Sequence, residues 1–85
     1  IEELERVLND EPRYALAHRL LATAYGKTGE TALAKIHLAE EAILQQNFDY
    51  ARQQAEGVVN SAPKDSREWR KAKDVLSYLD THDKG

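Results

Sequence analysis

The sequence has few of the residues that form disulfides and tight turns or carry thiol chemistry, and it has no long apolar run. It contains no cysteine, two prolines, four glycines and only six aromatic side chains. The absence of cysteine excludes disulfides and every form of thiolate chemistry. No apolar run approaches the roughly 18 residues that a membrane-spanning helix needs, so we expect no direct membrane insertion.

The charged residues are abundant but mixed in sign. Twelve Lys and Arg residues stand against fifteen Asp and Glu residues, which gives a net charge of -3. Even the basic tract from Arg67 to Lys73 is interrupted by Glu68, so it is typical of a solvated helix face, and we expect no nucleic-acid partner. The apolar share is rich in Ala and Leu, which favours helices over a sheet. The sequence therefore predicts one all-α domain covering residues 1–85.

Apolar residues at intervals of three and four predict five helices, and the breaks between them are well marked. We expect breaks near Pro12, Gly29, Asn47 and Pro63, because proline excludes the preceding residue from a helix and glycine permits a left-handed turn. The predicted helices cover about residues 1–9, 13–27, 32–45, 48–61 and a last segment that begins in Asp65–Glu68, an acidic variant of a capping box.

The same intervals predict which side chains form the core. In the second helix the predicted apolar stripe consists of Leu16, Leu20, Leu21, Ala24 and Tyr25. Across the chain, the residues that we expect to be largely buried are Leu21, Tyr25, Ala34, Leu38, Ala51, Ala55 and Trp69.

Residues that could carry chemistry are sparse. The histidines are His18, His37 and His82, and none forms an H-E-x-x-H motif or an i, i+4 pair. A hairpin centred on Gly29 places His37 at the level of Thr23, so the sequence predicts three separate histidines, no metal site and no cofactor. Adjacent carboxylates such as Glu40 and Glu41 diverge by about 100° on a helix and cannot act on one bond. We expect this chain not to be an enzyme.

Residues 18–25 (HRLLATAY) and the pair Ala34 and Leu38 resemble the two helices of a tetratricopeptide repeat. Pro12 and Pro63 lie 51 positions apart, one and a half periods of about 34 residues, so a second reading frame shifted by half a repeat is also present. The resemblance implies an antiparallel helical-hairpin solenoid that binds a protein or peptide. In such a repeat the polar line Arg19, Thr23 and Lys27, continued by Glu40 on the next helix, would bind the partner.

Segments 20–29 (LLATAYGKTG), 38–42 (LAEEA) and 50–55 (YARQQA) are similar to the C-terminal repeat domain of bacterial zinc-dependent metallopeptidases. That resemblance implies a non-catalytic tail of a periplasmic or outer-membrane-associated protease active in protein quality control. The zinc belongs to the catalytic domain of such a parent, and the partners are that domain and its substrates. The chain opens at Ile1 inside a predicted helix, and we expect it to be a piece of a larger protein. The alternative is an autonomous structural or oligomerisation module that pairs with a second copy.

Overall fold

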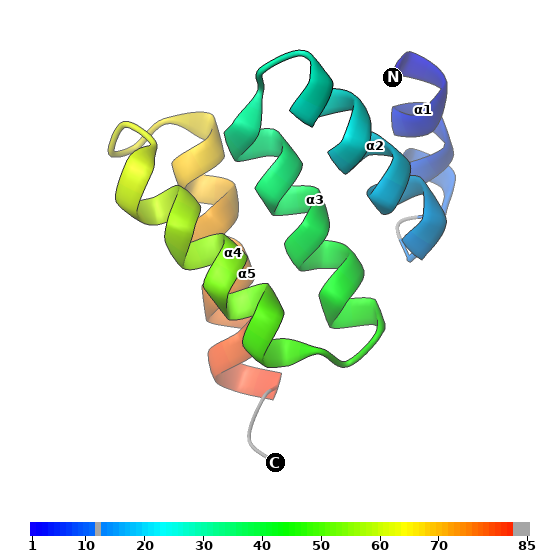
Figure 1. The fold of residues 1–85 in the computed structure, drawn as a ribbon. Coiled ribbons are helices and arrows are strands. Elements are labelled where there is room, and N and C mark those ends of the chain that lie inside the picture. Colours follow the sequence, from blue (N-terminus) through cyan, green and yellow to red (C-terminus); the bar gives the residue numbers. More distant parts are fainter. Residues whose placement is uncertain (12, 83–85) are drawn as a thin grey trace.

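A computed structural model describes residues 1–11 and 13–82 of the chain. These residues form five helices and no strand, which confirms the all-α prediction (Figure 1). The helices are α1 (Glu2–Asp10), α2 (Ala15–Lys27), α3 (Thr31–Leu44), α4 (Phe48–Ser61) and α5 (Arg67–His82). The predicted break at Pro12 lies outside the described residues, although α1 ends and α2 begins on either side of it.

In each of the three later turns, one residue adopts the left-handed backbone conformation. Gly29 has φ of +83°, and after it the Glu30 N–H donates to the Tyr25 carbonyl at 2.8 Å. This 6→1 hydrogen bond is the helix-ending motif that a glycine at this position favours. The following turns place Gln46 and Asp65 at φ of +62° and +67°. The α5 helix opens with the Ser66 hydroxyl accepting from the Trp69 N–H at 3.2 Å, one residue beyond the predicted cap at Asp65.

The α3 helix lies at the centre of the molecule. It packs against α2, α4 and α5, while α1 packs against α2. Figure 1 shows α2, α3 and α4 side by side with alternating direction, and α5 lying behind α4. The repeat-like solenoid implied by the sequence resemblance stays a prediction.

The core is built largely from alanines, which allow the helix axes to approach closely. One cluster joins α3, α4 and α5 around Ala51, Ala55 and Leu79, each fully buried. A second cluster joins Leu21, Tyr25 and Ala34 to partly buried leucines of α1 and α3. Five of the predicted core residues are thus confirmed as buried: Leu21, Tyr25, Ala34, Ala51 and Ala55.

The prediction was wrong for two other core residues and for part of the α2 stripe. Leu38 and Trp69 are only partly buried, and Trp69 presents its ring to Lys73 Nζ at 5.6 Å. Leu16 and Leu20 are 48% and 45% exposed. Successive residues of a helix diverge by about 100°, so the rotation that buries Leu21 turns Leu20 away from the core.

Candidate functional site

A pocket of about 380 Å³ lies over the middle of α3, between α1 and α5. Four helices contribute to its lining. The lining residues are Glu5, Leu8, Asn9, His18, His37, Glu40, Arg67 and Lys71.

Two further hollows adjoin this pocket and extend it toward the C-terminal end of α3. They measure about 160 and 290 Å³, and both are lined by Glu40, Ile43 and Tyr78. Arg13, His18 and Leu44 complete the lining of the smaller hollow, and Lys71, Asp74 and Val75 that of the larger. The three hollows share lining residues and form one depression, here called the α3 groove, which is polar at one end and largely apolar at the other.

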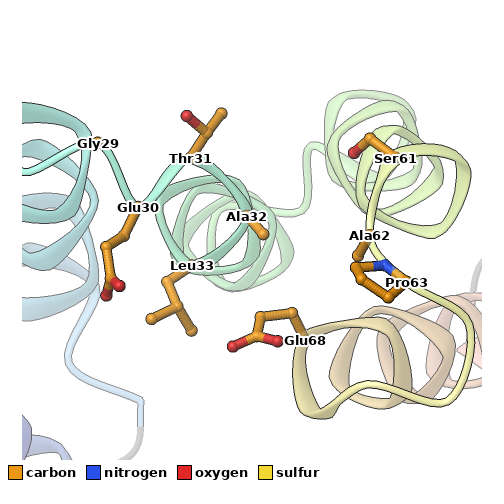
Figure 2. Close-up of a pocket in the computed structure, with 9 residues that line it drawn as sticks. All are labelled: Gly29, Glu30, Thr31, Ala32, Leu33, Ser61, Ala62, Pro63 and Glu68. Atoms are coloured by element: carbon orange, nitrogen blue, oxygen red, sulfur yellow. The ribbon is translucent and has the colours of Figure 1, made fainter.

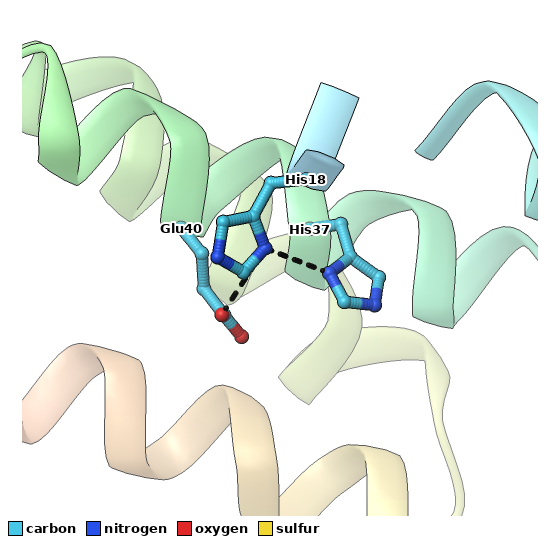
Figure 3. Close-up of side chains that lie close together, drawn as sticks. All are labelled: His18, His37 and Glu40. Atoms are coloured by element: carbon cyan, nitrogen blue, oxygen red, sulfur yellow. Dashed lines mark hydrogen bonds and ion pairs between the residues drawn. The ribbon is translucent and has the colours of Figure 1, made fainter. Parts of the chain in front are cut away.

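Two histidines and a carboxylate meet in the polar end of the α3 groove (Figure 3). His18 Nδ1 lies 3.0 Å from His37 Nδ1 and 3.5 Å from Glu40 Oε2. The His18 side chain is almost fully buried, whereas about a third of the Glu40 side chain is exposed. Contact between the two ring nitrogens requires that one carries a proton and the other accepts it, or that a cation lies between them.

Tyr25 and Glu5 support this cluster from its α1 side. The Tyr25 ring stacks on His37 with centroids 5.7 Å apart and an interplanar angle of 10°. The Tyr25 hydroxyl donates to the Glu5 carboxylate, and this hydrogen bond, together with burial and the negative charge of Glu5, raises the pKa of Tyr25 to about 12. Burial lowers the pKa of His37 to about 4, with the neighbouring His18 and Lys71 acting in the same direction. His37 is therefore neutral at pH 7.

The acidic and basic side chains of the α3 groove differ in whether they have partners. Glu5 accepts from Tyr25, and Glu40 lies beside His18. Burial raises the pKa of Glu40, although His18 and Lys71 oppose that shift. Among the described residues, no carboxylate oxygen lies within 4.0 Å of Arg67 or Lys71. Arg67 and Lys71 are therefore cations of the groove that no described carboxylate pairs directly.

The structure keeps three of the four predicted partner-binding residues together on α2 and places the fourth, Glu40, in the α3 groove. Arg19, Thr23 and Lys27 are exposed on α2 but do not line the α3 groove, whereas Glu40 is partly buried within it. Glu40 therefore does not continue the predicted line. Arg19 Nε instead lies 2.6 Å from an oxygen of Glu41, which is only 8% exposed. This ion pair ties α2 to α3, so Arg19 has a structural role that the sequence did not indicate.

The prediction that the histidines lie apart was wrong. The expected hairpin register places His37 at the level of Thr23, which lies only about 7.5 Å along the helix axis from His18, within the combined reach of two imidazole side chains. A signal for the cluster was present, because His37 and Glu40 stand at i, i+3 on one face of α3. His18 approaches that face from α2. His82 lies elsewhere, on α5, where its ring stacks on Tyr78 at 3.9 Å between centroids.

A separate hollow of about 330 Å³ lies where the α3 N-terminus approaches the end of α4 (Figure 2). Its floor includes Ala32, Leu33 and Pro63, and its acids are Glu30 and Glu68. In Figure 2 the Leu33 side chain lies between the two carboxylates. The described residues that line it include no histidine, lysine or arginine, so it has fewer means of recognising a ligand than the α3 groove.

No family model, curated protein or solved structure matches the chain. Among the described residues, none of the helices has the length and apolar character needed to cross a membrane.

Proposed function

We propose that the chain is a non-catalytic protein-interaction module that binds an extended peptide segment in the α3 groove. The observation that carries the proposal is the continuity of that groove from Arg67 and Lys71, which no described carboxylate pairs directly, to the apolar side chains of Ile43 and Val75. Peptide and small-ligand sites share a concave surface that combines apolar area with a few convergent polar groups, and the α3 groove offers both.

The groove indicates the chemistry of the bound segment. Arg67, Lys71, Val75 and Tyr78 follow one another at intervals of three and four, so they share one face of α5. Eleven residues of helix rise by about 16 Å, which matches about five residues of extended chain. We therefore propose a segment with an acidic side chain near Arg67 and Lys71 and an apolar side chain near Val75 and Tyr78.

The wider role rests on the sequence resemblance. We propose that the chain belongs to a larger zinc-dependent metallopeptidase of the bacterial envelope, in which it recruits substrates or docks on the catalytic domain during protein quality control. Catalysis and its zinc ion are assigned to that domain. The periplasmic or outer-membrane location is part of the same proposal.

Selection of short random peptides displayed on phage, with the purified chain as bait, tests this function. Enriched peptides should carry an acidic residue and, a few positions away, an apolar residue. The double variant Arg67→Glu/Lys71→Glu should weaken their binding by about tenfold or more, because about 1.4 kcal/mol of lost charge pairing corresponds to that factor. The matched control Lys27→Glu/Lys64→Glu changes the same charge outside the groove and should leave binding unchanged. Failure to enrich peptides, or equal weakening by both double variants, would refute groove binding.

A second candidate function, pairing with a second copy, is favoured by the exposure of Leu16 and Leu20. They lie at i, i+4 on α2, so they form one apolar patch on the surface. In sedimentation equilibrium, pairing through this patch would give a dimer that Leu16→Ser/Leu20→Ser converts to a monomer. A monomer at all concentrations would eliminate this candidate.

A further inference from the structure

We propose that His18, His37 and Glu40 form a binding site for a transition-metal ion, with Zn²⁺ as the best fit. The site would hold the ion between α2 and α3 at the polar end of the α3 groove. The argument for this site does not rest on peptide binding, and the site is distinct from any zinc ion of a parent catalytic domain.

The donor set matches zinc in type and spacing. Imidazole nitrogen and carboxylate oxygen are ordinary zinc ligands, whereas Mg²⁺ and Ca²⁺ prefer oxygen alone. In a tetrahedral site with bonds of about 2.05 Å, neighbouring donor atoms lie about 3.3 Å apart. The separations from His18 Nδ1 are 3.0 Å to His37 Nδ1 and 3.5 Å to Glu40 Oε2, which bracket that value. One donor atom from each residue lies within 4.8 Å of the other two.

The surroundings of the three side chains also suit a metal site. Stacking on Tyr25 fixes the plane of the His37 ring. Glu40 is partly exposed, so its carboxylate can turn to complete the site. His18, His37 and Glu40 all line the groove, so water from it could supply a fourth ligand.

Charge near the site is balanced. Glu40 belongs to the cluster itself, the carboxylate of Glu5 lines the same pocket from α1, and the cations of Arg67 and Lys71 line it from α5. The two acids offset the two bases, so the local field does not exclude a divalent cation.

Calorimetric titration of the tag-free 85-residue chain with ZnCl₂, after treatment with a chelator, tests the site. We expect saturable binding of one ion per chain and a rise in melting temperature that grows with free Zn²⁺. His37→Gln and Glu40→Gln should each weaken Zn²⁺ binding by about tenfold or more. Even the loss of a residue that only hydrogen-bonds to a metal ligand has an effect of that order. The control His82→Gln removes an exposed histidine and should leave binding unchanged.

A readout on the unaltered chain keeps the inference testable if a variant fails to fold. Long-range ¹H–¹⁵N spectra of the imidazoles should show the Nδ1 signals of His18 and His37 shifting together on addition of Zn²⁺. No binding, unshifted Nδ1 signals, or binding that only His82→Gln weakens would show that the histidines form a hydrogen-bonded pair without a metal.

Discussion

Reversing the charge of Arg19 should destabilise the chain strongly for a residue so exposed. The Arg19 side chain is 59% exposed, but that of Glu41 is only 11% exposed, and their charged atoms lie 2.6 Å apart. Exposed ion pairs contribute about 0.2–1 kcal/mol, whereas breaking a fully buried pair costs about 3–5 kcal/mol. Arg19→Glu leaves the Glu41 carboxylate without its partner and adds a second negative charge, so we expect a loss of about 2 kcal/mol.

Thermal unfolding followed by circular dichroism measures this loss. In a domain of this size, about 2 kcal/mol corresponds to a fall in melting temperature of roughly 8 to 16 °C. The control Lys64→Glu reverses an exposed charge outside any helix and should stay within about 0.5 kcal/mol. In a double-mutant cycle, Glu41→Gln should remove most of the additional cost of Arg19→Glu. If Arg19→Glu is as mild as Lys64→Glu, the ion pair does not hold α2 against α3 in solution.

Two further predictions concern the core and the histidine cluster. Ala51→Leu should lower the free energy of unfolding, measured in urea, by about 1–3 kcal/mol, because Ala51 is fully buried where helices approach closely. The control is Gln53→Leu on the exposed face of α4. Equal stabilities of the two variants would contradict the packing. In metal-free buffer the pKa of His37 is about 4 in the folded chain, against an ordinary 6.5. As the pH drops from 6.5 to 4, the unfolded chain therefore takes up a proton that the folded chain does not, and the stability of the fold decreases. His37→Gln should remove about 1–2 kcal/mol of that loss of stability, a figure reduced for the partial exposure of the ring. Identical pH profiles of stability for this variant and the unaltered chain would contradict the pKa shift.

The helices could be predicted from the sequence because local signals set them. Gly29 can adopt the positive φ that ends α2, and Pro63 interrupts the chain after α4. The predicted range of α4, residues 48–61, agrees with its observed bounds. These breaks depend on the conformational limits of single residues, so they can be predicted without knowing which residues pack nearby.

The site could not be predicted in the same way, because it depends on the rotation of one helix against another. The apolar residues of α2 occur on several sides of the helix, and the sequence did not show that Leu21 would be buried and Leu20 exposed. That rotation also directs Arg19 to Glu41 and His18 to His37 and Glu40. Residues 40 and 41 were predicted to diverge, and Glu40 was assigned to the partner-binding line, but the sequence did not show that Glu40 would lie beside His18 and Glu41 beside Arg19.

Mapping of backbone amide chemical shifts tests the central claim, peptide binding in the α3 groove, most directly. The ¹⁵N-labelled chain would be titrated with a peptide enriched in the selection. The account predicts that the largest shifts fall on α3 and α5 around Ile43, Lys71, Val75 and Tyr78, with Leu20 and Lys27 on the outer side of α2 unchanged. Shifts concentrated on that outer side of α2, with the α3 groove unperturbed, would contradict it.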